Sequence, residues 1–107
     1  TLLDTGRFLI KLVEVTPGKR LSQQYHNHRS EHWIVVSGCA TVECDGKVFD
    51  LKTNESTFIP MKAVHRVGNR SEMPLQFIEV QVGEYLSEDD IVRLEDDWHR
   101  EGTPGVH

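Results

Sequence analysis

Short stretches rich in β-branched and aromatic residues, separated by polar turn-forming residues, fill most of this chain. Pairs such as Pro17-Gly18, Asp45-Gly46 and Gly68-Asn69 mark the breaks. This spacing is typical of the strands of a barrel or sandwich, so we expect an all-β fold. Asp45-Gly46 also predicts a tight hairpin, because both residues tolerate positive φ. The predicted strands are Arg7–Val15, Glu31–Ser37, Ala40–Cys44, Lys47–Leu51, Thr57–Ile59 and Leu75–Val82.

The pattern changes its period only near the C-terminus. Ser87 and the acidic residues after it have the composition of a helix N-cap and first turn. Apolar residues then recur at helical spacing from Ile91 to Trp98. The spacing predicts a short amphipathic helix near Glu88–Trp98 that packs on the barrel.

The length of the chain limits it to one hydrophobic core. At 107 residues it is long enough for one modest core and too short for two. We expect residues 1–100 to form a single domain and residues 101–107, which show no periodicity, to be a disordered tail. The chain begins almost inside its first predicted strand, so we expect either a piece of a longer protein or a compact stand-alone domain.

Charge and hydropathy narrow the class of partner. The formal net charge is -5, and no segment concentrates Lys and Arg, which argues against a nucleic-acid or anionic-membrane surface. No apolar stretch approaches the roughly 20 residues that span a bilayer, and the first residues lack the pattern of a secretory signal. We therefore expect a cytoplasmic protein whose partner is a small molecule or another protein.

Candidate metal ligands gather in two short windows. In the first, an extended segment points Gln24 and His26 to one face, and Glu31 opens the next predicted strand. In the second, His65 follows a tight turn. If the shared face is the barrel interior, an amide oxygen, two imidazoles and a carboxylate converge there. This donor set suits zinc, iron, nickel, cobalt or manganese and excludes a soft thiolate site.

The spacing of these residues resembles the two motifs of the cupin superfamily. The first motif is matched at Gly18, Gln24, His26, Glu31 and Gly38, with glutamine in place of its first histidine. The second is matched at Asn54, Pro60, His65 and Asn69. Asn54 and Lys62 stand where the second motif usually has glycine. The resemblance implies a double-stranded β-helix, a jelly-roll-like barrel, that commonly forms a homodimer by pairing sheet edges.

A longer resemblance, from about Gly6 to Arg100, is to the type II mannose-6-phosphate isomerases. The segment Gln24–Trp33, QYHNHRSEHW, carries much of it. Further matching segments are Val35–Gly38, Asn54–Ser56, Ile59–Pro60, Pro74–Leu75, Ile78–Gln81 and Tyr85–Arg93. Such modules usually form the C-terminal part of bifunctional mannose-1-phosphate guanylyltransferase/mannose-6-phosphate isomerases of bacterial and archaeal polysaccharide synthesis. The resemblance implies a sugar phosphate substrate, a role in GDP-mannose synthesis, and fusion to a guanylyltransferase domain in the full-length protein.

The same resemblance implies a ligand set. The zinc of type I phosphomannose isomerases is held by a Gln-x-His pair, a glutamate and a distant histidine. This pattern corresponds to Gln24, His26, Glu31 and His65. Zinc is the metal we expect, with cobalt, manganese, nickel or iron as alternatives.

Interconversion of mannose 6-phosphate and fructose 6-phosphate needs a base near C1 and C2. Lys11 lies on the same side of its predicted strand as apolar residues, so its amine enters the barrel if that side faces the core. Glu79 is a second candidate, although its parity allows it to face solvent. His28 is expected either to support a metal ligand or to carry a proton.

The phosphate of the substrate needs a fixed positive charge. Arg29 lies beside the ligand cluster and is the expected phosphate ligand, because guanidinium binds phosphate bidentately. Arg66 and Lys62 flank His65 and either close the same pocket or lie on a solvated loop. Trp33 is expected in the core, and His32 should face away from it.

Three functions fit these observations. The first is a metal-dependent aldose-ketose isomerase for mannose 6-phosphate. The second is a non-catalytic metal-binding module that stabilises or dimerises a guanylyltransferase. The third is an oxygenase with a two-histidine, one-carboxylate iron site, which Gln24 and Arg29 disfavour. The chain itself has no Gly-rich nucleotide loop of the guanylyltransferase type, so we do not expect it to transfer a guanylyl group.

Overall fold

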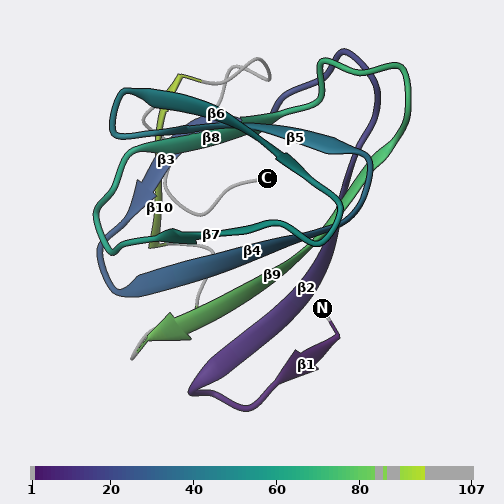
Figure 1. Ribbon diagram of the computed structural model, residues 1–107. Helices are drawn as coiled ribbons and strands as arrows, with labels where there is room; N and C mark the ends of the chain where they lie inside the picture. The colour runs from purple at the N-terminus through teal and green to yellow at the C-terminus, as the bar shows by residue number, and fades with distance from the viewer. Residues whose placement is uncertain (1, 84–85, 87–89, 96–107) are drawn as a thin grey trace.

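The computed structural model describes residues 2–83, 86 and 90–95, and these residues form two facing β-sheets (Figure 1). The predicted tail 101–107 lies outside this range. No helix in the described part has the length and apolar character needed to cross a membrane. The strands of the described part are β1 (Leu3–Asp4), β2 (Phe8–Val15), β3 (Gln23–His26), β4 (Arg29–Ser37), β5 (Cys39–Cys44), β6 (Lys47–Lys52), β7 (Ser56–Ile59), β8 (His65–Gly68), β9 (Leu75–Gly83) and β10 (Ile91–Glu95).

Each sheet has five strands, and neighbouring strands pair in antiparallel fashion. The first sheet has the order β1-β2-β9-β4-β7 and the second the order β10-β3-β8-β5-β6. Because neighbours in a sheet are seldom neighbours in sequence, the chain passes repeatedly from one sheet to the other (Figure 1). This confirms the predicted all-β, double-stranded β-helix.

The strands predicted from the sequence are all present, within one or two residues of their expected ends. The hairpin at Asp45-Gly46 is also confirmed, since it joins β5 to β6 with φ of 49° and 82° at its two residues. Positive φ at both positions is the signature of a turn whose twist matches that of its strands.

The predicted C-terminal helix near Glu88–Trp98 is wrong where the structure describes it. Ile91–Glu95 form strand β10, which pairs with β3 at an edge of the second sheet. Ile91 and Arg93 are buried and Leu94 is 47% exposed, so the side chains alternate as in a strand. The edge of β3 offers backbone hydrogen-bond partners to an added strand, and this tertiary contact outweighs the helical spacing. The rest of the predicted helix lies outside the described residues.

Apolar side chains fill one end of the space between the sheets, and polar side chains gather at the other end. One row across the first sheet is apolar: Val13, Phe77 and Val35. The next two rows are Lys11, Glu79 and Trp33, then Leu9, Gln81 and Glu31. Directly opposed residues in antiparallel strands share a face, so the register itself brings the polar side chains together.

Lys62 has a left-handed backbone, with φ of 67°. A side chain in this region costs roughly 1–2 kcal/mol, whereas glycine has no such penalty. The Lys62 side chain is exposed, and its backbone N–H donates a hydrogen bond to the His26 carbonyl at 2.7 Å, which glycine at this position retains. This conformation explains why glycine is usual at this position of the motif.

We expect Lys62→Gly to raise the free energy of unfolding by up to about 1 kcal/mol, after the greater freedom of glycine in the unfolded chain is subtracted. Urea denaturation measures the change. The matched control is Lys52→Gly, at an exposed position in strand β6, which should lower stability. Equal losses in the two variants would contradict the assigned strain at Lys62.

Candidate metal centre

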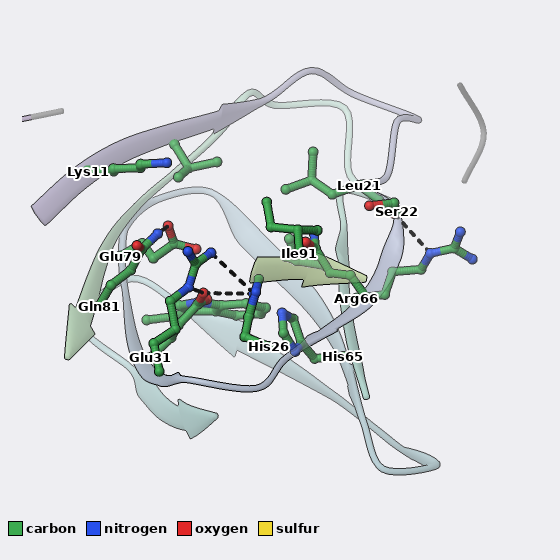
Figure 2. A pocket seen from close by; sticks show the side chains of 15 residues that line it. Lys11, Leu21, Ser22, His26, Glu31, His65, Arg66, Glu79, Gln81 and Ile91 are labelled. Atoms are coloured by element: carbon green, nitrogen blue, oxygen red, sulfur yellow. Dashed lines mark hydrogen bonds and ion pairs between the residues drawn. The ribbon is translucent and has the colours of Figure 1, made fainter. Parts of the chain in front are cut away.

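A cavity of about 190 Å³ lies at the polar end of the barrel (Figure 2). Both sheets contribute to its wall. The first sheet provides Lys11, Arg29, Glu31, Trp33, Glu79 and Gln81. The second provides Gln24, His26, His65, Arg66, Val67 and Ile91. Residues far apart in the sequence therefore share one partly enclosed space.

His26, Glu31 and His65 form a buried cluster in the wall of this cavity. One ligand atom of each residue lies within 4.8 Å of the others. His26 ends β3, Glu31 lies in β4 and His65 begins β8, so the cluster joins the two sheets. The Nε2 atom of His26 lies 3.0 Å from Oε2 of Glu31. The structure thus brings these three side chains together inside the barrel; their role as metal ligands stays a prediction.

The hydrogen bonds of His65 fix its tautomer. Its Nδ1 atom lies 3.0 Å from the carbonyl oxygen of Ala63, which can only accept, so Nδ1 carries the proton. Burial lowers the pKa of His65, and the nearby His26 and Arg29 lower it further, against the opposing effect of Glu31. A neutral imidazole with Nε2 unprotonated is the form that binds a metal ion.

Glu31 is the most heavily bonded member of the cluster. The indole N–H of Trp33 donates to Oε1 at 2.8 Å, and Nε–H of Arg29 donates to Oε2 at 3.1 Å. Burial alone would raise the pKa of Glu31, but its hydrogen bond to His26 and its electrostatic interactions with His65 and His26 hold that pKa well below the usual value. The group is therefore an oriented carboxylate.

The residues of the cluster fit a divalent metal ion. The Nδ1 atom of His26 is buried and has no hydrogen-bond partner among the described residues, although buried polar atoms are normally paired. Two imidazoles and a carboxylate form a donor set that suits zinc and its neighbours. Gln24 lines the same cavity and stands directly opposite His65 in the β3–β8 ladder, which places it beside this set.

Glu79 and Lys11 line the cavity next to the cluster (Figure 2). They face each other across β2 and β9. Burial, together with the charge of Glu31 and a hydrogen bond to it, raises the pKa of Glu79 to about 8. Gln81 opposes this by donating a hydrogen bond to Oε2 of Glu79 at 2.7 Å. Two adjacent carboxyl groups with separated pKa values are a common acid-base arrangement.

The remaining predicted site residues occupy different environments. Arg29 is buried in the cavity wall, and its Nη2 lies 3.4 Å from Nε2 of His26. Arg66 also reaches the wall, with its Nε–H donating to the Leu21 carbonyl at 2.9 Å. His28 is exposed and lines a separate surface depression, so the structure does not bring it into the cavity. Lys62 is exposed and is not part of the wall either.

The sequence reading missed two residues that organise the site. Gln81 is 1% exposed and donates a hydrogen bond to Glu79. Its position two residues after Glu79, on the same side of the strand, was the signal in the sequence that could have indicated it. Asp90 accepts hydrogen bonds from the backbone N–H groups of Asn27 and His28, at 3.1 and 2.9 Å. Asp90 thereby anchors the turn between His26 and Arg29, a contact that no local pattern in the sequence indicates.

Gly83 packs directly against the turn that leads to Arg29. A Cβ atom at this position would overlap the carbonyl oxygen of His28 and come 2.8 Å from Cα of Arg29. We therefore expect Gly83→Ala to lower the free energy of unfolding by about 1–3 kcal/mol, the usual cost of overpacking. Urea denaturation tests this, with Val82→Ala as the exposed neighbouring control. Equal stability of Gly83→Ala and the wild-type chain would contradict the close contact.

Comparison with solved structures supports the fold class. The cupin domain of Cnp3 from Schizosaccharomyces pombe is similar to this chain with a TM-score of 0.73. The likeness covers 78% of this chain and 61% of that one at 13% identity, which concerns the fold alone. The molecule is a cupin barrel whose His/Glu/His cluster could hold a metal ion.

The family follows from sequence comparison. The family model described as "Mannose-6-phosphate isomerase C-terminal" matches residues 1–96, and the chain belongs to this family. The alginate biosynthesis protein AlgA of Pseudomonas aeruginosa is 56% identical over 101 residues, which are 94% of this chain and 21% of that protein. A mannose-1-phosphate guanylyltransferase of Klebsiella pneumoniae is 43% identical over 92% of this chain and 21% of its own length. The chain thus spans about a fifth of the curated relatives it matches.

Proposed function

We propose that this chain is a metal-dependent aldose-ketose isomerase that interconverts mannose 6-phosphate and fructose 6-phosphate for GDP-mannose and polysaccharide synthesis. The observation that carries the proposal is the shared cavity, in which the His26, Glu31 and His65 cluster lies beside Glu79 and Lys11. Family membership supports the same substrate class. The cytoplasmic location remains a prediction.

The proposed reaction moves one proton between adjacent carbons. In the forward direction a base removes the proton from C2 of the open-chain sugar and a proton is returned to C1, while the hydroxyl proton passes from O2 to O1 as the carbonyl moves from C1 to C2. Glu79 suits this task as a carboxylate when it accepts the proton and as a carboxylic acid when it returns it. Gln81 orients its Oε2 atom. Lys11 faces Glu79 and is the alternative base, or a donor to a sugar oxygen.

The proposed metal site supplies charge stabilisation. A divalent ion held by Gln24, His26, Glu31 and His65 would act as a Lewis acid toward the sugar oxygens as negative charge develops on them. Trp33 and Arg29 hold the Glu31 carboxylate in place through their N–H donors. Zinc is the proposed metal, because imidazole and carboxylate donors in a small buried site favour it.

Arg29 is the proposed phosphate ligand. Its guanidinium lies in the cavity wall, and Nε and Nη2 approach Glu31 and His26. We propose that the same guanidinium also donates a hydrogen bond to the phosphate. This contact would hold the substrate in a fixed position relative to the proposed metal ligands. A catalytic role for His28 has less support, because its side chain is exposed outside the cavity.

The experiment is to incubate the purified, zinc-loaded chain with mannose 6-phosphate and follow the formation of fructose 6-phosphate in a coupled assay. We expect turnover in the wild-type chain and its loss in Gln24→Ala. Metal binding without turnover would contradict the isomerase.

The second candidate is a metal-binding module that stabilises or dimerises a guanylyltransferase. It is favoured by the similarity of this chain to about a fifth of the mannose-1-phosphate guanylyltransferase of Klebsiella pneumoniae. In that case the isolated chain should not isomerise the sugar. Deletion of the corresponding segment from a full-length relative should then reduce guanylyl transfer. Turnover by the isolated chain, with guanylyl transfer intact after the deletion, would exclude this candidate.

A further inference from the structure

The outward face of the first sheet is apolar, and no described element packs on it. Its residues, which we call the outer face, are Ile10, Leu12, Ile34, Val36, Phe58, Ile78, Val80 and Val82. Five of them are between 41% and 50% exposed: Leu12, Ile34, Val36, Phe58 and Val82. Contiguous exposed apolar patches of this kind usually mark an interaction site, whereas scattered ones do not.

The strand register makes the outer face continuous. One row across β2, β9 and β4 consists of Leu12, Ile78 and Ile34. The adjacent row consists of Ile10, Val80, His32 and Phe58. The rings of His32 and Phe58 lie 4.8 Å apart at the β7 end of this row. In Figure 1 these strands form the layer opposite β5, β6 and β8, and the outer face is the side of that layer turned away from those strands.

The charge pattern favours a second copy of this chain as the occupant. Among the outward positions of β2, β4, β7 and β9, Glu14 alone carries a formal charge, and it lies near the end of β2. Two chains of net charge -5 repel each other, so they associate best through a surface that places no like charges face to face. The outer face meets this condition.

The edge strands β6 and β7 are less suited to self-association. The exposed edge strand β6 carries Lys47, Asp50 and Lys52, and β7 has only four residues. Charged and short edge strands are the usual protection against edge pairing. A homodimer formed through the β6 or β7 edge therefore has less support than one formed through the outer face; edge pairing was the expectation from the sequence.

The area of the outer face suits a reversible dimer. Strands β2, β4 and β9 have eight or nine residues each and β7 has four. With a rise of about 3.4 Å per residue and a strand spacing of about 4.8 Å, these four strands cover on the order of 500 Å² in projection. Side-chain relief increases the accessible area toward the roughly 800 Å² per partner of a standard interface. A dimer of this size should dissociate on dilution.

We propose that two copies of this chain pack outer face against outer face, as two sheets of a sandwich do. The inference is independent of the proposed isomerase activity, because it involves no residue of the cavity. It explains why Ile78 and Val80, on the outward side of β9, are apolar: they would lie in the interface between the two copies. It also leaves the cavity, on the opposite face of the same strands, open to a substrate.

Sedimentation velocity at a series of protein concentrations tests the proposal. We expect the wild-type chain to change from monomer to dimer as its concentration rises. Ile34→Lys, at the centre of the outer face, should raise the dissociation constant at least about tenfold, since each dimer would bury two unpaired charges. The matched control is Val48→Lys, a 57% exposed apolar position in β6 of the other sheet, which should dimerise like the wild type.

Circular dichroism establishes that each variant is folded. If Ile34→Lys does not fold, Leu12→Lys on the neighbouring strand serves instead, because Leu12 is 42% exposed. A wild-type chain that stays monomeric at every concentration would overturn the proposal. So would a folded outer-face variant that dimerises as strongly as the wild type.

Discussion

His65→Ala should reduce metal affinity and isomerase turnover in the purified chain by more than about a hundredfold. The imidazole begins β8 with Nδ1 bonded to Ala63, which leaves Nε2 to serve as a ligand. Loss of a group that only supports a ligand typically costs 10–100-fold in metal affinity or activity. Loss of the ligand itself should exceed this, so we expect a reduction of more than about a hundredfold in both quantities.

His32→Ala is the matched control for this prediction. His32 lies in β4 beside Glu31, but its side chain faces outward and contacts Phe58. Metal content, measured on protein dialysed against a known zinc concentration, and turnover should both stay near wild-type values. Equal losses in His65→Ala and His32→Ala would show that the cluster has no special role.

Glu79→Gln should reduce kcat by about 10²–10⁴-fold while the bound metal is retained, because removal of a general base typically costs this much. Glutamine keeps the size of the side chain, so the contact with Gln81 can persist while the proton-accepting group is lost. The expected pattern is a fall in kcat with little change in KM, as for a group that acts mainly in the transition state.

Exchange with solvent gives an independent readout of the same step. During turnover in D₂O, fructose 6-phosphate should gain deuterium at C1 in the wild-type chain, and this incorporation should slow in parallel in Glu79→Gln. Glu14→Gln, an exposed glutamate of β2, is the control and should behave as the wild type. Full activity of Glu79→Gln would assign the proton transfer elsewhere, with Lys11 as the next candidate.

Local patterns in the sequence were sufficient to predict most of the described strands, and the motif spacing anticipated that His26, Glu31 and His65 lie close together. The hairpin at Asp45-Gly46 could be predicted because its turn chemistry is local. The convergence of His26, Glu31 and His65 required a barrel that folds the two motif windows together, and the motif spacing indicated this arrangement. The parts of the site that follow from the motif spacing, and hence from the fold, can therefore be predicted from the sequence.

The orientation of Glu79 could not be predicted, for a physical reason. Strand β9 presents apolar residues on both sides, Phe77 inward and the half-buried Ile78 and Val80 outward. Alternation identifies the core face only when the other face is polar. The apolar outer face therefore obscured which parity of β9 lines the cavity.

The C-terminal strand was predicted as a helix for a related reason. Ile91–Glu95 fits both periods over so short a length, and the choice depends on a partner strand far away in sequence. The role of Asp90, which bonds the turn after His26, depends on the same distant pairing. Contacts of this kind become visible only once the two sheets are assembled.

The dependence of turnover on bound metal tests the central claim most directly. The chain is stripped with a chelator, zinc is returned in steps, and the initial rate of mannose 6-phosphate conversion is measured against the metal content of each sample. The account predicts no conversion in the stripped protein and a rate that rises in proportion to bound metal until each chain holds one ion. A rate that is the same with and without metal would contradict it.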